Sequence, residues 1–239
     1  MVIVYTFRSA WDAVDLSPFV LKLLTWMRMT GVAHRAERGD IRKAPKRKLP
    51  YIDDGERLLG DSSLIIEHLL AKGVASPLAG DALSPVDAAI ATAFKGMIEC
   101  ELYFVIVYSR WIHPHGFRTY SPVLKEAIAR MGVPRLFTGL ALFYLRRQMV
   151  RQLYQQGMGR HEPSVVLAKG KRQVDAIAAY LGDKPYFMGD EPATIDATVF
   201  AFVDSLTNTP LFPELTEHVE RHDNLVRYRK RMRDRYWSA

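Results

Sequence analysis

The chain has 239 residues, a formal net charge of +7 and a composition of 49% hydrophobic and 25% charged residues, which is typical of a soluble globular protein. Its single cysteine, Cys100, excludes an internal disulfide framework and a cysteine metal cluster, and favours a reducing compartment. The longest apolar runs are far shorter than the roughly 18 residues that a membrane-spanning helix needs. We therefore expect a cytoplasmic protein without a transmembrane segment.

Strand-like and helix-like segments alternate in the first part of the chain. We expect strands at residues 2–7, 32–37, 49–52 and 57–59, and helices at residues 18–30 and 62–70. The turn Asp53-Asp54-Gly55 predicts a hairpin between the last two strands. The order βαβ, hairpin, helix predicts a small α/β domain over residues 1–72.

Helical periodicity replaces the strand pattern after Pro85. Glycines, prolines and small side chains in residues 73–84 predict a linker. Apolar stripes then predict helices at residues 86–112, 134–156, 164–181, 195–206 and 225–236. The predicted fold class is α+β with two domains, the second being an all-helical domain over residues 85–239.

The first helix begins at a Ser-Pro pair. Ser17 supplies an N-cap hydroxyl, and Pro18 is favoured at the first helical position. The Ser17 hydroxyl also stands at the end of the loop that follows the first strand, over a helix N-terminus, where it could stabilise a bound thiolate. Both interpretations, helix cap and thiolate partner, are open.

A second pair of segments predicts a pocket for a small peptide-like anion. Pro50 interrupts an apparent strand and cannot donate to a ladder hydrogen bond, so it marks an edge or a special backbone geometry. Asp61 and Ser62 begin the next helix, where free N–H groups and the helix dipole bind carboxylates. A helix cap without a ligand is the alternative interpretation of Asp61 and Ser62.

Taken together, these motifs resemble the glutathione S-transferase superfamily, whose members have a thioredoxin-like N-terminal domain and an all-helical C-terminal domain. The resemblance is to the failed axon connections and metaxin-like branch in particular. It is carried by Ser17-Pro18-Phe19-Val20, Lys48-Leu49-Pro50-Tyr51, Asp61-Ser62 and residues 189–197, and for the branch by residues 16–23, 101–111, 157–161 and 181–190.

The resemblance implies a glutathione site. Pro50 would be a cis-proline, and Leu49 would offer its backbone to the cysteinyl part of glutathione. Asp61 and Ser62 would hold the γ-glutamyl end, while Lys48 would attract the glycyl carboxylate. Ser17 would be the catalytic hydroxyl of a serine-type transferase, with glutathione as substrate or ligand. The alternative hydroxyl is that of Tyr5, for which the alternation of side chains in the strand favours a structural role.

Several residues depart from the family pattern or point elsewhere. Ser17 and Val20 stand where redox-active members carry thiols, so dithiol chemistry is not expected. Cys100 lies between glutamates that disfavour a thiolate, and we interpret it as structural. Asp196 lacks the reciprocal capping partner because residue 193 is alanine, and we expect it to support folding.

The histidines and the aromatic residues of the helical part do not indicate another reaction. We expect His113-Pro114-His115 to form a surface turn rather than a metal site, and we expect no metal. An aromatic wall could line an apolar acceptor pocket or simply pack between helices; it consists of Tyr103, Tyr108 and Trp111.

Three functions are consistent with the sequence. The first is a transferase that binds glutathione and conjugates its thiolate to a small apolar electrophile. The second is a non-catalytic module of the same fold that binds a ligand or a protein. The third is a surface-binding role of Arg227, Arg231 and Arg235, which share one helix face and could meet an anionic membrane or nucleic acid, although neighbouring Asp223 and Asp234 reduce that charge. We expect a homodimer from the resemblance and no nucleic-acid partner.

Overall fold

The computed structural model describes residues 1–238 and begins with a four-stranded sheet in the order β2-β1-β3-β4. β1 (Val2–Thr6) pairs in parallel with β2 (His34–Arg38) and antiparallel with β3 (Tyr51–Asp53), which forms a hairpin with β4 (Leu58–Gly60). The predicted βαβ unit followed by a hairpin is therefore confirmed, with strand ends displaced by one to two residues.

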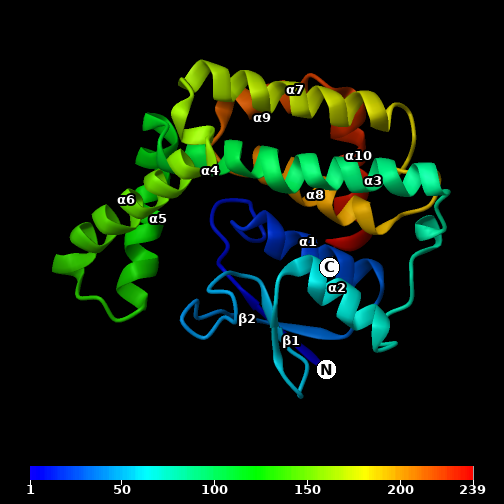
Figure 1. Ribbon diagram of the computed structural model, residues 1–239, viewed down its shortest axis with the longest axis horizontal. Helices are drawn as coiled ribbons and strands as arrows, with labels where there is room; N and C mark the ends of the chain where they lie inside the picture. The colour runs from blue at the N-terminus through cyan, green and yellow to red at the C-terminus, as the bar shows by residue number, and fades with distance from the viewer. Residues whose placement is uncertain (239) are drawn as a thin grey trace.

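Two helices of the first half, α1 (Pro18–Met29) and α2 (Ser62–Ala71), lie between the sheet and the helices of the second half (Figure 1). α1 packs against α8 (Thr194–Thr207), which runs through the centre of the helical part. The buried residues of α1 contribute to two cores: Val20 and Leu23 belong to the core of the sheet, and Leu21 belongs to that of the helical domain. α1 is thus enclosed on both sides.

The second half of the chain is helical, as the sequence predicts. After the 3₁₀ turn η1 (Ala79–Asp81), its remaining elements are α3 (Pro85–Met97), the π-helical turn η2 (Ile98–Leu102), α4 (Tyr103–Trp111), α5 (Pro114–Arg130), η3 (Arg135–Phe137), α6 (Thr138–Gln156), η4 (Met158–Arg160), α7 (Pro163–Leu181), α9 (Pro213–Glu220) and α10 (Asp223–Tyr236). The predicted linker, residues 73–84, contains η1 and no strand. The domain limits at residues 72 and 85 remain our proposal.

Two helices differ from the sequence prediction. α5 begins at Pro114, with His113 as its N-cap residue, so the turn that we expect at His113-Pro114-His115 is limited to residues 112 and 113, and the helix over 114–130 is absent from the prediction. Proline at the first helical position starts the helix rather than stopping it, because its missing N–H would have no partner there in any case. α9 begins in the same way at Pro213 and is absent from the prediction.

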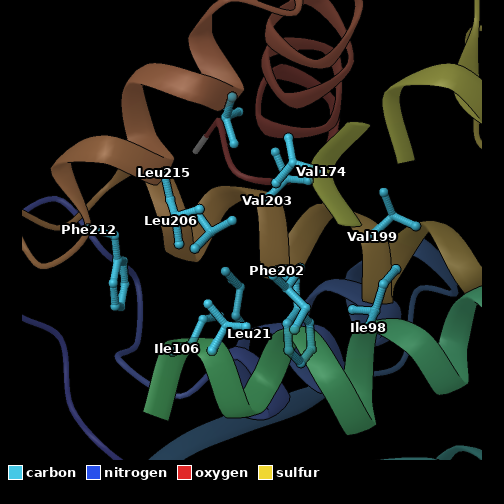
Figure 2. Packing of buried hydrophobic residues seen from close by; sticks show 14 of the residues in the cluster. Leu21, Ile98, Ile106, Val174, Val199, Phe202, Val203, Leu206, Phe212 and Leu215 are labelled. Atoms are coloured by element: carbon cyan, nitrogen blue, oxygen red, sulfur yellow. The ribbon is translucent and has the colours of Figure 1, made fainter. Parts of the chain in front are cut away.

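The core of the helical domain forms where α4, α7 and α9 meet α8. Figure 2 shows Ile106 of α4, Val174 of α7 and Leu215 of α9 around Val203 and Phe202 of α8. Asp196 near the start of α8 is fully buried and accepts hydrogen bonds from the backbone N–H groups of Phe187 (2.7 Å) and Ala193 (2.9 Å) and from the hydroxyl of Tyr228 (2.8 Å). These contacts join three segments and agree with the folding role that we expect for Asp196.

α5 and α6 form a hairpin that projects from one end of the molecule (Figure 1). We call residues 114–156 the arm. Leu142 and Leu153 of α6 are buried, and the helix packs on α4 and α5 along this side. Within the described residues, no helix is long and apolar enough to cross a membrane.

Candidate functional site

Three chain segments meet at one edge of the sheet. β3 is antiparallel to both of its neighbours, with Tyr51 opposite Tyr5 of β1 and opposite Gly60 of β4. The start of β3 therefore lies beside the ends of β1 and β4. This register brings the Leu49–Pro50 bond, the start of α2 at Asp61 and the loop of residues 7–17 to the same edge.

The Leu49–Pro50 peptide bond is cis, which confirms the geometry that we predict for Pro50. Pro50 is buried and Leu49 is half-buried. The loop before them approaches β1 closely, because the N–H of Gly39 donates to the carbonyl of Thr6 at 2.8 Å. A Cβ on Gly39 would lie 2.4 Å from Cδ2 of Leu49, so a larger residue here would displace the Leu49 side chain.

Asp61 is the N-cap residue of α2 and has a φ of +88°, a region that residues other than glycine rarely adopt. Its Oδ1 atom accepts from the N–H groups of Ser63 (3.0 Å) and Leu64 (3.4 Å). Its Oδ2 atom lies 3.7 Å from Nζ of Lys46, and 44% of the side chain is exposed. One carboxylate oxygen thus caps the helix while the other faces a cation and solvent.

A buried lysine, which the sequence analysis missed, stands behind the start of α2. The ammonium of Lys22 is 1% exposed and donates to Oγ of Ser63 at 2.9 Å and to Oε1 of Glu99 at 2.6 Å. Burial lowers the pKa of Lys22, although the Glu99 carboxylate opposes this shift. The signal in the sequence is a lysine between Leu21 and Leu23, within the otherwise apolar run of residues 18–24. Lys22 thereby connects α1 to α2 and to η2.

Ser17 is the N-cap residue of α1, which is the first of the two roles that we expect for it. Its Oγ atom accepts from the N–H of Val20 at 3.4 Å. This contact uses a lone pair and leaves the hydroxyl proton free to donate to another atom. The carboxylate of Asp15, which is 3% exposed, braces the same loop by accepting from the N–H groups of Ser17 (2.7 Å) and Phe7 (2.9 Å). Cap and thiolate partner are therefore compatible roles.

Asp15 also faces a buried cation. Burial raises the pKa of Asp15 to about 7, against the opposing effects of its backbone hydrogen bonds and of the Arg110 guanidinium. Arg110 is 7% exposed and lies 5.6 Å from the ring centroids of Tyr120 and Phe212. Among the described residues, its Nε and Nη2 atoms have no hydrogen-bond partner. Sequence analysis singled out neither Asp15 nor Arg110.

The alternative hydroxyl, that of Tyr5, belongs to a stacked pair. Its ring lies 4.3 Å from that of Tyr51, centroid to centroid, with an interplanar angle of 16°. Tyr51 is buried, so the pair contributes to packing at this edge of the sheet. This arrangement accounts for Tyr5 without a catalytic role, whereas Ser17 retains a free hydroxyl proton.

The three predicted acceptor-pocket residues separate in space. Tyr108 and Trp111 are 4% and 7% exposed and belong to the core of the helical domain, which agrees with the packing interpretation. Tyr103 is half-buried and contacts Phe19 edge to face, with ring centroids 4.9 Å apart. Tyr103 therefore lies beside the first turn of α1, close in the chain to Ser17.

Other sequence candidates are exposed or are engaged in packing. Lys48 is exposed, and Cys100 is an exposed free thiol on η2. Arg231 donates to the carbonyl of Pro185 at 2.7 Å and Arg235 donates to the hydroxyl of Tyr186. These two arginines hold the segment before α8, which leaves less free charge for the surface-binding hypothesis.

One group of metal-binding side chain types occurs on the opposite side of the molecule, between α7 and α9 (Figure 1). The Oδ1 atom of Asp175 accepts from Nε2 of His218 at 2.7 Å and from Nε2 of His222 at 2.9 Å. These are hydrogen-bond distances, and the contacts connect α7 to the corner between α9 and α10. The group is remote from Ser17 and Asp61.

Comparison with known proteins supports the arrangement described above. Residues 18–116 match the family model of the glutathione S-transferase N-terminal domain, and residues 170–232 match that of the C-terminal domain. The chain is 33% identical to an isoprene-epoxide glutathione S-transferase of Rhodococcus over 99% of both chains. It is 26% identical to Failed axon connections of Drosophila melanogaster, with 98% of this chain and 58% of that protein covered.

More distant relatives and solved structures agree. Mouse metaxin-2 is 25% identical, with 82% of this chain and 72% of that protein covered. The crystal structure of the β-etherase LigF from Sphingobium has a TM-score of 0.64 at 14% identity, with 97% and 94% of the two chains covered. Both the thioredoxin-like domain and the helical domain are therefore confirmed. The chain belongs to the glutathione S-transferase superfamily and is similar to its failed axon connections and metaxin-like branch.

Proposed function

We propose that the protein binds glutathione at the edge formed by Leu49, Pro50, Asp61 and Ser62, and conjugates its thiolate to a small apolar electrophile. The observation that carries the proposal is the start of α2. There, Asp61 holds an exposed carboxylate oxygen beside the N-terminus of the helix, in a backbone conformation that is unfavourable for aspartate. Such conformations are found at ligand-binding sites more often than elsewhere.

The two ends of the γ-glutamyl group match the charges at this helix. The exposed Oδ2 atom of Asp61 is an acceptor for the ligand ammonium. Ser62 and the helix N-terminus are donors for the ligand carboxylate, and the Lys22 ammonium, which is paired with Glu99, holds Ser63 in place behind them. The exposed Lys46 and Lys48 are cations for the glycyl carboxylate.

Ser17 supplies the chemistry in this proposal. Its hydroxyl donates to the sulfur and stabilises the thiolate, which lowers the pKa of the bound thiol. The thiolate then attacks an electrophilic carbon: a carbon–sulfur bond forms, and the bond to the leaving group, or one carbon–oxygen bond of an epoxide, breaks with its electron pair and takes up a proton. The similarity to a transferase named for isoprene epoxide supports an apolar epoxide as the first electrophile to test. Tyr103 and Phe19 offer apolar surface beside α1.

Calorimetry with glutathione tests the binding step. Asp61→Ala should weaken binding at least tenfold, because the ligand ammonium loses its carboxylate. Asp183→Ala is a matched control, since Asp183 is a fully exposed aspartate of the helical domain whose carboxylate lies 3.8 Å from Arg227. Absence of glutathione binding to the wild-type protein, or equal affinity of the Asp61→Ala variant, contradicts the proposed site.

A pH profile of conjugation tests Ser17. Ser17→Ala should lower kcat by about a hundredfold near neutral pH, and the loss should shrink at high pH, where the thiol ionises without help. Ser17→Thr retains a hydroxyl and should retain most of the activity. An equal loss at every pH would assign Ser17 a purely structural role.

The second candidate is a non-catalytic module of the same fold, which the similarity to Failed axon connections favours. Glutathione binding without turnover of any electrophile in a broad panel would select it. A cytoplasmic location and a homodimer also belong to the proposal: the single cysteine and the family resemblance support them. Sedimentation of the purified protein tests the dimer, and fractionation of cells tests the location.

A further inference from the structure

The outer face of the arm is apolar and exposed. Five residues of η3 and α6 are more than half exposed although they are large hydrophobic side chains: Leu136 (87%), Phe137 (53%), Leu140 (54%), Phe143 (58%) and Tyr144 (62%). Their spacing of one, four, seven and eight residues places them on one side of the helix. The other side of α6 carries Leu142 and Leu153, which are buried. The helix therefore has two apolar faces, and only one is covered by the fold.

The same arm carries most of the net charge of the protein. Residues 114–156 contain seven arginines and lysines against one acidic residue, Glu126, a formal balance of +6 in a chain of +7. Glu126 itself pairs with Arg8 and Arg130. Arg147 and Arg151 are exposed and continue the outer face of α6 beyond Tyr144. An apolar stripe thus leads into a basic stripe along one helix.

A basic hollow lies beside the apolar stripe, near the end of the arm. Its volume is about 770 Å³, and its lining includes Lys125, Arg130 and Arg135 as well as the paired Glu126. Gly132 and Pro134, in the turn between the two helices, also line it. A concave cationic surface of this size suits the phosphate of a lipid headgroup.

We propose that the arm is a peripheral binding site for anionic lipid membranes. Leu136, Leu140 and Phe143 enter the boundary between headgroups and acyl chains, while Arg147 and Arg151 meet the anionic headgroups. Apolar side chains on one helix face together with flanking cations are the features that bind helices to membrane surfaces.

Charge selects this occupant over others. A second copy that docked through the same face would bring two arms of +6 together, which is unfavourable. A nucleic acid would match the charge but would leave the five apolar side chains in water. All of the arm after residue 116 also lies in the stretch that neither family model matches, since the first match ends at residue 116 and the second begins at 170. The lipid proposal therefore does not rest on the proposed glutathione site.

Vesicle sedimentation tests the proposal. The full-length protein should bind phosphatidylcholine vesicles that contain about 30% phosphatidylserine, and should bind pure phosphatidylcholine vesicles far less at about 0.1 M salt. Arg147→Gln with Arg151→Gln should reduce the partition coefficient roughly 30-fold, at about fivefold for each cation. Leu140→Ser with Phe143→Ser should reduce it at least tenfold, since membrane affinity scales with buried apolar area.

The matched control removes the same charge elsewhere. Arg227→Gln with Lys230→Gln changes two exposed cations of α10, whose side chains are 59% and 75% exposed, and should change binding less than twofold. An equal loss in this control would overturn the proposal, because net charge alone would then explain binding. Absence of vesicle binding by the wild-type protein would also overturn it. Two further results would do the same: serine variants that lose a dimer but still bind vesicles, or a wild-type protein that binds duplex DNA instead of vesicles and whose serine variants still bind that DNA.

Discussion

α1 and α6 depart from the usual amphipathic pattern in opposite ways: α1 buries a charged side chain, and α6 exposes large apolar side chains. α1 buries an ammonium, that of Lys22, between the two domains. α6 exposes Leu140 and Phe143 to solvent at the end of a projecting hairpin. The buried cation has a partner within the chain, Glu99, whereas the exposed apolar face has none in the described structure. The buried charge is therefore paired by folding itself, whereas the exposed apolar face can be covered only by another molecule.

This difference has an energetic consequence. A buried charge that loses its partner destabilises the fold by several kcal/mol, because it cannot be resolvated. An exposed apolar side chain contributes little to folding, so its replacement leaves stability nearly unchanged. Polar residues around α1 should therefore be sensitive to substitution, and apolar residues on the outer face of α6 should be tolerant.

The largest expected effect is at Lys22. Lys22→Ala leaves the Glu99 carboxylate without its 2.6 Å partner and should reduce the free energy of unfolding by about 3–5 kcal/mol. Urea denaturation followed by circular dichroism measures this change. The double variant Lys22→Met with Glu99→Gln removes both charges and should recover most of the loss. A single variant as stable as the wild type would mean that the pair is not enclosed.

A smaller effect, dependent on pH, is expected at Asp15. Its pKa is raised to about 7 in the folded protein, so between about pH 4 and 7 the folded state holds a proton that the unfolded chain has lost. The contribution of Asp15 to stability therefore falls as pH rises through this window. The stability of the wild type relative to Asp15→Asn should fall on the order of 2 kcal/mol between pH 5 and 8. Urea titrations at the two values measure it, and a difference that rises with pH would contradict the burial of this group.

Two variants at Asp61 distinguish the effect of losing the helix cap from the effect of the backbone conformation. Asp61→Ala loses the N-cap and retains a Cβ at a φ of +88°, whereas Asp61→Gly loses the cap but suits that backbone. The glycine variant should be more stable than the alanine variant by about 1 kcal/mol. Thermal denaturation of the two variants compares them directly. Equal stability would show that the backbone relaxes when the carboxylate is removed.

The smallest effect is expected on the outer face of the arm. Leu140→Gln should change the free energy of unfolding by less than about 0.5 kcal/mol, since 54% of this side chain is exposed. Leu142→Gln, two residues away and 4% exposed, should cost at least about 2 kcal/mol. Urea denaturation of this pair checks the assignment of the two faces. Similar losses in both variants would mean that the outer face is covered in solution.

Local sequence signals predicted most of the elements and part of the site. The Ser17-Pro18 start, the Asp53-Asp54-Gly55 turn and the Asp61 cap depend on residues a few positions apart, and each is present in the structure. α5 was missed because His113-Pro114-His115 resembles a turn until the following residues pack. The roles of Lys22, Asp15 and Arg110 depend on contacts far along the chain, as from Lys22 to Glu99, and no local pattern contains them.

The sequence by itself predicted the order of the strands and of most helices, because caps, turns and periodicity are properties of neighbouring residues. The resemblance of its motifs identified the family and the segments of the proposed glutathione site. The tertiary structure decided which charges are enclosed and which apolar faces are left open. α1 is covered on both sides because α8 packs against it, and the outer face of α6 is exposed because no described element reaches the arm there. Burial depends on what lies opposite a side chain, and that is settled only when distant parts of the chain come together.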